Sequence, residues 1–424
     1  MRIGIQTWGS AGDIRPFLAL AGGLQRAGHN ITLAITSVDG KDYTPLAQAL
    51  NIKLRSVGDK LLEYDTEVYE QLKFELTRKR ISLDQLKIIL DYFFEPVVEK
   101  IYKVSKNLCK ENDIVIGHFL VYPLFIAAEK SGIPLLTVTL NHSGIPSRYV
   151  TPFGLPRIGS WMNPIWWNLV HFLVNRYFKR SINTFRVHEG LPPVKRILTE
   201  AWRSQHMNLI AVSPVFCHHR KDWERYSHVC GFFNVTEGAE VWHTPEKLQE
   251  FLKSGPPPVF MTFGSMISVD PHVADITGLL VDAAHLAGCR AIVQSRWEEI
   301  NHIPEGSDIY RVTDLPHRYL FPYCSAIVHH GGSGTTQTAA QYGCPSVVVE
   351  HFGDQSFWGN ELKRIGIAGK TLHRKSITAK KLAQELKAVL SSPDMKARAQ
   401  SIGEVMRKEK GVTKAVELIE EHFQ

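Results

Sequence analysis

Short apolar runs alternate with helical patterns along the first third of the chain. Between the first two runs, apolar residues recur at helical spacing from Phe17 to Leu24, and this pattern ends near Gly28. A second helical pattern lies around residues 127–131. Apolar strands that alternate with helices are typical of a parallel sheet with helices on both faces. The strands predicted here are residues 2–7, 30–36, 114–116 and 135–139.

A second alternating system opens after the turn-forming sequence Gly255-Pro256-Pro257-Pro258. The pattern divides the chain into a first domain (1–230), a linker (231–255), a second domain (256–405) and a C-terminal helix (406–424) that packs back on the first domain. The strands predicted in the second domain are residues 259–262, 291–294, 326–329 and 346–349.

Two such open sheets predict an α/β protein of two Rossmann-like domains whose parallel sheets face each other across an interdomain cleft. In open parallel sheets, ligands bind beyond the carboxyl ends of the strands. Two glycine-rich loops, one in each predicted domain, follow such strand ends. We therefore expect the ligand site in the cleft.

Composition agrees with a globular protein of two or three domains, because 44% of the 424 residues are hydrophobic and 21% are charged. The formal net charge of +7 fits an anionic small ligand or an anionic membrane surface, although it requires neither. No block of like charges is long enough to predict nucleic-acid binding. A monomer or a weak homodimer is expected.

Six cysteines are scattered singly, which is typical of a reduced, cytoplasmic protein. The chain runs from Met1 directly into its first predicted strand, so we expect no signal peptide. The segment 158–178 is rich in aromatic residues, but Pro164 and several polar residues make it a poor membrane span. Core packing, the wall of an apolar pocket and peripheral contact with a membrane all remain open for this segment.

The most specific motif follows the predicted strand 326–329: His329-His330-Gly331-Gly332-Ser333-Gly334-Thr335-Thr336. A helix N-terminus has unpaired backbone N–H groups and a partial positive charge, and glycines let a diphosphate approach that backbone. A tight turn without a ligand is the alternative. The number of side-chain donors in the motif favours a phosphate site.

Asp354 and Gln355 follow the next predicted strand. An acid beside an amide can bind the vicinal hydroxyls of a sugar, but Asp354 could equally cap a helix that begins at Gln355. The chain contains no Asp-x-Asp pair, so we do not expect a metal-bridged diphosphate, and the helix dipole would have to stabilise the diphosphate. A resident cofactor is not expected either.

The loop Gly9-Ser10-Ala11-Gly12-Asp13 joins the first strand to the first helix. Asp13 is placed to be a helix N-cap, and residue chemistry alone favours that role over a general base. His118, at the end of a neighbouring strand, is a structural histidine, a partner of Asp13 or a group that polarises the acceptor. His142 and Arg148 line the following loop, and the Cys217-His218-His219 cluster has too few ligands for zinc.

Together, these motifs resemble those of family 1 glycosyltransferases, in particular the sterol glucosyltransferase-like enzymes and the bacterial antibiotic and glycolipid glycosyltransferases. The resemblance spans almost the whole chain and is most specific at Gly264-Ser265, at Leu315-Pro316-His317, at residues 329–336 and at residues 353–359. It implies a GT-B fold, with an acceptor domain first and a donor domain second, and a metal-independent displacement that inverts the anomeric carbon.

The resemblance also implies roles for particular residues. Asp13 stands where the sterol-like branch has aspartate and many relatives have the catalytic histidine, which favours Asp13 as the base. His118 stands where the histidine-type relatives have the partner aspartate. The aspartate and the histidine of the pair would thus have exchanged positions in this chain. The implied donor-binding residues are Gly12, Gly264, Ser265, Asp314, Leu315, His317, His330, Gly332, Ser333, Gly334, Thr335, Asp354 and Gln355. His142, Arg148 and Trp161 are the candidates for acceptor binding.

This chain lacks the tryptophan that many plant members have in the base-binding loop, and Asp314 lies near that position. The choice between uracil and thymine is therefore open. UDP-glucose is the favoured donor and a small apolar alcohol the favoured acceptor: a sterol, a lipid or a polyphenol or other natural product. The alternatives are a dTDP-rhamnose-dependent rhamnosyltransferase, a nucleotide-sugar epimerase and a binding protein without catalysis.

Overall fold

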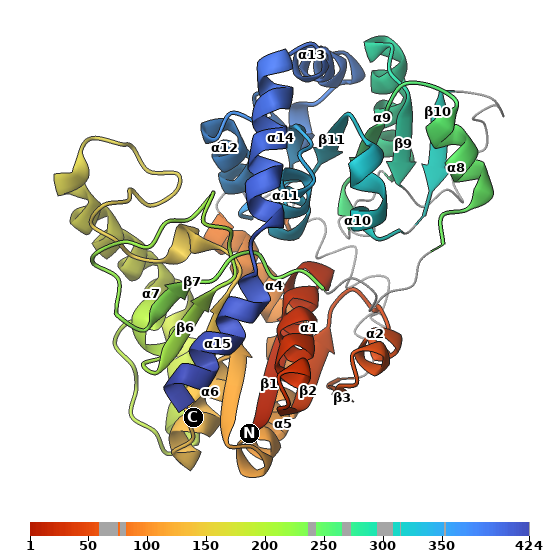
Figure 1. The fold of residues 1–424 in the computed structure, drawn as a ribbon. Helices are drawn as coiled ribbons and strands as arrows, with labels where there is room; N and C mark the ends of the chain where they lie inside the picture. Colours follow the sequence, from red (N-terminus) through yellow and green to blue (C-terminus); the bar gives the residue numbers. More distant parts are fainter. Residues whose placement is uncertain are drawn as a thin grey trace. The chain divides into compact units, whose positions relative to one another are not determined.

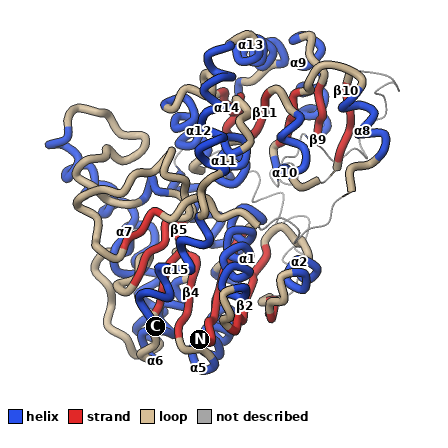
Figure 2. Tube along the Cα trace, in the orientation of Figure 1, coloured by secondary structure: helices blue, strands red, loops and turns tan. Residues whose placement is uncertain are grey.

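The computed structural model describes residues 1–58, 75–76, 82–235, 243–264, 273–294, 308–313, 315–351 and 353–423. The chain divides into two compact units, each with its own parallel sheet (Figures 1 and 2). The first unit comprises Met1–Leu72, Leu83–Glu240 and Lys410–Gln424, and the second comprises Lys73–Ser82 and Val241–Glu409.

The sheet of the first unit has the strand order β3-β2-β1-β4-β5-β6-β7, and every pair is parallel. Its strands are β1 (Arg2–Gly9), β2 (Asn30–Ser37), β3 (Lys53–Ser56), β4 (Ile114–His118), β5 (Leu135–Thr139), β6 (Met207–Ile210) and β7 (Ser227–Val229). Its helices are α1 (Ala11–Arg26), α2 (Thr44–Ala49), α4 (Ser82–Phe93), α5 (Val98–Glu111), α6 (Tyr122–Ser131), α7 (Asn163–His188) and α15 (Gly411–Phe423).

Side chains alternate across this sheet, as expected for strands buried on both faces. Ile3 and Ile5 of β1 pack in a core with α1 and α15, whereas Val115 of β4 packs in a second core with α5, α6 and α7. The last helix of the chain, α15, lies along α1 (Figure 1), and Glu420 on α15 accepts a hydrogen bond from the buried His29. The C-terminal helix is therefore part of the core of the first unit.

The sheet of the second unit has the order β10-β9-β8-β11-β12-β13 and is also parallel. Its strands are β8 (Val259–Thr262), β9 (Ala291–Gln294), β10 (Ile309–Val312), β11 (Ala326–His329), β12 (Ser346–Glu350) and β13 (Leu372–His373). Its helices are α8 (Glu246–Lys253), α9 (Val273–Ala287), α10 (His317–Leu320), α11 (Ser333–Gln341), α12 (Gln355–Arg364), α13 (Ala379–Leu390) and α14 (Pro393–Arg407).

Part of the segment predicted to be a linker belongs to this second unit. Helix α8 lies within residues 231–255, and its Leu248 is buried against Phe260 and Ile292 of the sheet. A single buried leucine gives a weak sequence signal, although it docks the helix.

The order in both sheets is the doubly wound one, in which the chain moves outward from a central strand in one direction and then in the other. The reversal lies between β1 and β4 in the first sheet and between β8 and β11 in the second. Loops at the carboxyl ends of these strands separate and leave a crevice that is the usual ligand site of such sheets. Each unit therefore has one favoured place for a ligand.

Candidate active site

Asp13 lies at the favoured edge of the first sheet, in the first turn of α1. The sequence suggested Asp13 as the N-cap of this helix. The helix begins at Ala11, however, so its N-cap is Ser10. The Asp13 Oδ2 accepts hydrogen bonds from the Ser10 backbone N–H at 3.0 Å and the Ser10 hydroxyl at 3.3 Å. Asp13 is thus the third helical residue and closes a capping box, which fixes the direction of its carboxylate.

His118 ends β4, on the other side of the reversal, and its side chain is buried with 2% exposure. Its Nδ1 accepts the backbone N–H of Leu120 at 3.3 Å. Burial lowers the pKa of His118 to about 3, so the ring is neutral at physiological pH. A neutral ring that accepts at Nδ1 must have its proton on Nε2.

The Nε2 of His118 lies near the Asp13 carboxylate. His118 Nε2 lies 3.8 Å from Asp13 Oδ1, and no described group lies within hydrogen-bond distance of this nitrogen. The Asp13 side chain keeps 38% exposure. The arrangement therefore offers a partly exposed carboxylate, steadied on one oxygen by Ser10 and facing a neutral N–H donor on the other.

Asp39 follows β2 at the same sheet edge and was not singled out from the sequence. Asp39 Oδ2 accepts the backbone N–H of Ala11 at 2.7 Å, and its Oδ1 accepts the Ser37 hydroxyl at 2.8 Å. The buried Tyr43 also donates to it, and burial followed by the Asp39 charge raises the pKa of that phenol. Two carboxylates therefore occupy the N-terminal end of α1, and a third anion would be repelled there. The position of Asp39 just after a strand was the available signal.

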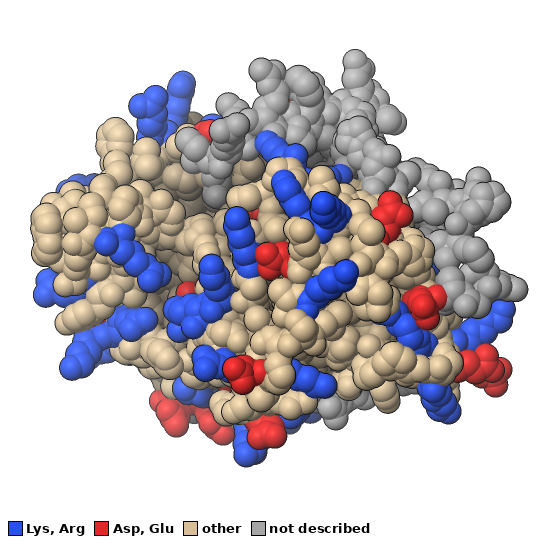
Figure 3. Space-filling model, turned by 90° about the horizontal axis from the view of Figure 1, so that it is seen from above, with Lys and Arg blue, Asp and Glu red and all other residues tan. Residues whose placement is uncertain are grey.

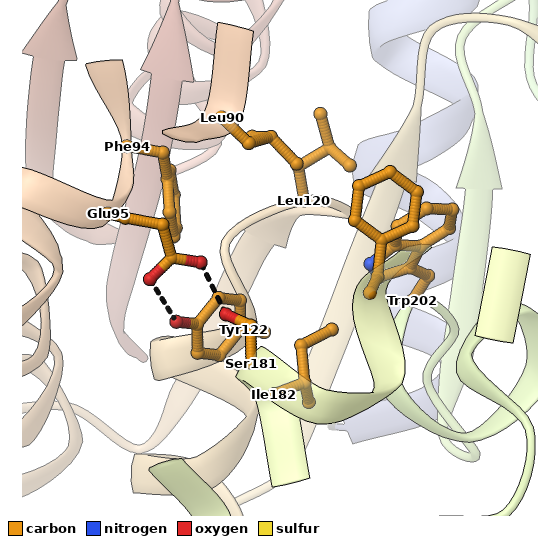
Figure 4. Close-up of a pocket in the computed structure, with 9 residues that line it drawn as sticks. Leu90, Phe94, Glu95, Leu120, Tyr122, Ser181, Ile182 and Trp202 are labelled. Carbon is orange, nitrogen blue, oxygen red and sulfur yellow. Dashed lines mark hydrogen bonds between the residues drawn. The ribbon is translucent and has the colours of Figure 1, made fainter. Parts of the chain in front are cut away.

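A small cavity lies beside Leu120, the residue that orients His118 (Figure 4). Its volume is about 20 Å³, enough for one water molecule, and it is mostly apolar. Glu95 is its one acidic group and accepts hydrogen bonds from Ser181 at 2.5 Å and Tyr122 at 3.3 Å. A cavity of this size does not accommodate a ring system such as a sterol.

The three acceptor candidates lie in segments after β5. His142 begins a short 3-10 turn, and Arg148 is exposed, with its backbone N–H bound by Asp222 at 2.6 Å. Trp161 is 69% exposed, so its ring lies on the surface of the first unit and does not wall an enclosed pocket. Gly12 is exposed at the second position of α1.

In the second unit, β11 leads through His330 and two glycines into α11, whose N-cap is Gly332. Gly331 has a φ of +91°, and a Cβ on it would lie 2.8 Å from the carbonyl oxygen of Gln355. Only glycine allows this turn, which brings the α11 loop against the start of α12. The first turn of α11 contains no acidic residue, in contrast to α1.

The ring of His330 is held between two other glycines. A Cβ on Gly264 would lie 2.9 Å from its Cε1, and a Cβ on Gly332 would collide with its Nε2. Its Nδ1 is shielded from solvent and has no hydrogen-bond partner among the described residues. Burial, and then the neighbouring His351 and His317, lower the pKa of His330. The site thus places a neutral imidazole next to a helix N-terminus.

Two further imidazoles lie at this edge. Burial lowers the pKa of His329 to about 3 and that of His351 to about 4. His329 Nδ1 accepts the N–H of Gly331 at 3.1 Å, and His351 packs against Phe263. His351 was not singled out from the sequence, although it stands at the end of β12 directly before the predicted sugar-binding motif.

Asp354 and Gln355 differ in their surroundings. Asp354 is the N-cap of α12 by position, but its side chain makes no capping hydrogen bond and accepts the Trp358 indole N–H at 3.0 Å. Gln355 is buried, and its amide oxygen accepts the backbone N–H of His351 at 2.7 Å. Asp354 is therefore exposed on a loop whose backbone is held by the buried Gln355 amide.

The remaining donor candidates divide between the core and the surface. Leu315 is buried in the core with Phe260, so its side chain is not available to a ligand. His317 begins α10 and stacks on Phe321 at 4.8 Å. Ser265 and Asp314 lie outside the described residues. Ser333, Gly334 and Thr335 form the first turn of α11.

Within the described ranges, no group of three or more His, Cys, Asp or Glu side chains is arranged to hold a metal ion. His329 and His330 directly precede the glycines and the N-terminus of α11, whose first turn contains no acid, whereas His373 is paired with Glu350 at the end of β12. The donor set of this edge is therefore suited to an anion.

Both halves of the chain match known sequence families. Residues 3–139 match the glycosyltransferase family 28 N-terminal domain, and residues 282–421 match the C-terminal domain of the erythromycin biosynthesis protein CIII-like family.

Similar proteins include an O-mycaminosyltylonolide 6-deoxyallosyltransferase of Streptomyces fradiae, which is 29% identical over 99% of this chain and 97% of its own. A sterol 3-beta-glucosyltransferase of Arabidopsis thaliana, UGT80B1, is 26% identical over all of this chain and 68% of its own. Among solved structures, the glycosyltransferase VinC in complex with dTDP has a TM-score of 0.66 and 20% identity, covering 100% of this chain and 99% of its own.

The family matches cover the strand ends that hold Asp13 and His118 and the loop from His329 to Thr336. The two parallel sheets have the order expected of paired Rossmann-like units. The chain belongs to the GT-B glycosyltransferases, with a family 28-type N-terminal half and an EryCIII-like C-terminal half.

Proposed function

We propose that this glycosyltransferase transfers glucose from UDP-glucose to a hydroxyl group of a small apolar acceptor, with inversion and without a metal. The observation that carries the proposal is the opposite charge of the two sites. The edge of the first sheet presents a carboxylate that faces a neutral histidine, and that of the second presents a helix N-terminus without acids. The first suits a hydroxyl that must lose its proton, and the second suits a diphosphate.

In the proposed reaction, Asp13 accepts the proton of the acceptor hydroxyl as its oxygen attacks the anomeric carbon. The new carbon–oxygen bond forms as the bond to the diphosphate breaks, and the nucleoside diphosphate leaves with the bonding electrons. His118 acts as a positioning residue, because its Nε2–H faces Asp13 Oδ1 and restrains the carboxylate. Backbone N–H groups of the α11 first turn, together with His330, stabilise the charge that develops on the leaving group.

The proposed donor contacts follow from the second unit. Gly264 and Gly332 position His330, while Ser333, Gly334 and Thr335 supply the helix end. Asp354, exposed beside this loop, binds a sugar hydroxyl, and Gln355 orders the loop from within. Ser265, Asp314, Leu315 and His317 are retained as contacts of the phosphate and base, Leu315 through its backbone. Gly12 is retained as a donor contact and His142, Arg148 and Trp161 as acceptor contacts.

A dTDP-deoxysugar donor is the second candidate. The Streptomyces fradiae relative is a deoxyallosyltransferase, and the VinC structure contains dTDP. The acceptor class is drawn from the same relatives: a sterol or a macrolide-like natural product. The scattered cysteines favour a cytoplasmic location.

Nucleotide binding and product analysis test this proposal together. Thermal shift against UDP, dTDP and GDP is expected to select one nucleotide, and its sugar conjugates are then incubated with sterol, hydroxy-fatty-acid, polyphenol and macrolide acceptors. A β-linked product from an α-linked donor, absent when the acceptor is omitted, is the expected result. Conversion of the donor alone would indicate an epimerase, and no shift with any nucleotide would contradict the phosphate assignment.

A further inference from the structure

Exposed apolar side chains are concentrated in one part of the first unit. Seven of the eleven large hydrophobic residues found exposed among the described residues fall between positions 149 and 172. Four of them follow one another at helical spacing and form what we call the α7 stripe: Trp161 in the 3-10 turn directly before α7, and Ile165, Leu169 and Phe172 in its first turns. The other three precede it: Tyr149, Phe153 and Ile158. Such a concentration marks an interaction surface.

The α7 stripe is held outward by the rest of the segment. The opposite side of α7 is buried in the core through Trp167, Val174 and Phe178. Trp167 Nε1 donates to the Val150 carbonyl at 2.9 Å, and Asn163 Nδ2 donates to the Arg148 carbonyl at 2.8 Å. Turning the stripe inward would break this packing, so its exposure is a fixed property of the fold.

The charged residues of the segment that contains the stripe have one sign, although carboxylates of other segments, Asp84 and Asp222, contact it at Tyr177 and Arg148. No Asp or Glu occurs between Glu129 and Glu189, whereas this interval contains seven Lys and Arg residues. Arg186 is paired with Glu129, but Arg157, Arg176 and Arg180 are exposed. Lys and Arg side chains border a broad tan area at the left of Figure 3, the side on which Figure 1 draws the segment before α7. The surface is apolar with a basic border.

We propose that the α7 stripe and its basic border dock on an anionic lipid surface. Tryptophan and phenylalanine on one line of a helix, bordered by arginine and lysine, match the two layers of a membrane interface. A symmetric contact between two copies would place the same basic border against itself, which disfavours a second copy as the occupant. The contact is peripheral, because no described helix has the length and apolarity required to cross a bilayer.

Vesicle sedimentation tests this surface without reference to catalysis. The full chain is expected to sediment with vesicles of phosphatidylcholine and phosphatidylglycerol, and at least about tenfold less with phosphatidylcholine alone. The double variant Ile165→Ser/Phe172→Ser is expected to lose about tenfold in binding. Its matched control, Tyr323→Ser/Val405→Ser, removes equally exposed apolar side chains from the second unit and is expected to bind like the wild type.

The charge component is tested separately. Arg176→Gln/Arg180→Gln is expected to weaken binding to the mixed vesicles about tenfold, whereas Lys396→Gln/Lys408→Gln, equal in charge change, is expected to leave it unchanged. Equal thermal unfolding would show that all variants fold. The proposal is overturned if the wild type stays in solution with both vesicle types or if the stripe variant binds undiminished. A wild-type dimer that Ile165→Ser/Phe172→Ser converts to a monomer would also overturn it, by assigning the stripe to a second copy.

Discussion

The helices α1 and α11 both begin at a reversal point of their sheet, yet their first turns have opposite electrostatic character. The N-terminal end of α1 binds two carboxylates of the protein itself, with Ser10 N–H to Asp13 at 3.0 Å and Ala11 N–H to Asp39 at 2.7 Å. The first turn of α11 has a glycine cap and no acid. Both helix ends carry a partial positive charge. At α1 the two carboxylates compensate this charge, whereas at α11 it is free to attract an external anion.

The same contrast underlies the proposed division of chemistry between the two helix ends. In the proposed reaction, the end of α1 positions a carboxylate for proton transfer, and the end of α11 binds the leaving group. The nearest histidine is neutral in both places, because burial lowers the pKa of His118 and of His330. Neutral imidazoles donate hydrogen bonds without adding charge, so the sign of each site is set by its carboxylates and its helix.

The largest expected effect comes from removing the charge at α1. Asp13→Asn keeps an oxygen for the Ser10 N–H but cannot accept a proton, so turnover is expected to fall by about 10²–10⁴-fold. Nucleotide affinity is expected to stay at the wild-type value. Steady-state rates with saturating donor and calorimetric nucleotide titration measure the two quantities, and a variant that retains full turnover would remove Asp13 from the role of base.

The reverse change makes α11 resemble α1. Thr335→Asp puts a carboxylate at the third position of α11, where Asp13 stands in α1, and repulsion of the diphosphate is expected to lower nucleotide affinity by at least about tenfold. Stability is expected to rise slightly, because an acid in the first turn is favourable. Gln400→Glu adds the same charge at an exposed site of the second unit and serves as the control. Unchanged affinity in Thr335→Asp would remove α11 from the diphosphate site.

His118 is expected to act through its Nε2–H. His118→Leu removes this donor and is expected to lower turnover about tenfold to a hundredfold, whereas His118→Gln supplies an amide N–H and should recover part of the loss. Both variants remove the ring, so a purely structural role would impair them equally. Turnover and thermal unfolding measured side by side separate the two interpretations.

The position of His330 depends on its glycine neighbours. In Gly332→Ala the new methyl group collides with the ring, and loss of the imidazole contact is expected to reduce nucleotide affinity about tenfold. Gly278→Ala in α9 meets no atom within 4 Å and is expected to add up to about 1 kcal/mol of stability without changing affinity. Equal nucleotide affinity in the two variants would argue against a role for His330.

The smallest expected effect is that of the buried His329 on the pH dependence of the unfolding free energy. The pKa of His329 is about 3 in the folded protein, against about 6.5 when unfolded. Between these values only the unfolded state binds the proton, so this contribution to stability is complete above pH 6.5 and is lost as pH falls towards 3. His329→Gln is expected to reduce the slope of unfolding free energy against pH, between pH 6 and 5, by about 1.4 kcal/mol per unit. Denaturant titrations measure it, and an identical slope would contradict the buried neutral state.

The central strands were predictable from sequence because burial on both faces makes them continuous apolar runs. The predicted bounds of β5, β8, β9 and β11 agree with the structure. The strands β3, β7, β10 and β13 were not predicted, because they are the edge strands of the two sheets and are only partly buried, so they are not continuous apolar runs. The remaining strand that was not predicted, β6, is interrupted by Asn208. Helix α7 was read only as an aromatic segment, because one of its sides is apolar and exposed while the other is apolar and buried.

Within the candidate site, the sequence indicated candidate residues but not their contacts. Asp13 was expected to be an N-cap, and the true cap is Ser10, three residues earlier, because a capping box and a simple cap give similar patterns. The tautomer of His118 depends on the Leu120 N–H, and the role of Asp39 depends on the pairing of β1 with β2. The position of Asp39 after a strand is visible in the sequence, but its contact with the Ala11 N–H is not.

The proposed division of base and diphosphate between α1 and α11 is tested most directly by calorimetric titration of the preferred nucleotide into wild type, Asp13→Asn and Thr335→Asp. Turnover is measured on the same samples. We expect Asp13→Asn to keep wild-type affinity and lose turnover, and Thr335→Asp to lose affinity. Equal losses of affinity in the two variants, or wild-type turnover in Asp13→Asn, would contradict the division of base and diphosphate between α1 and α11.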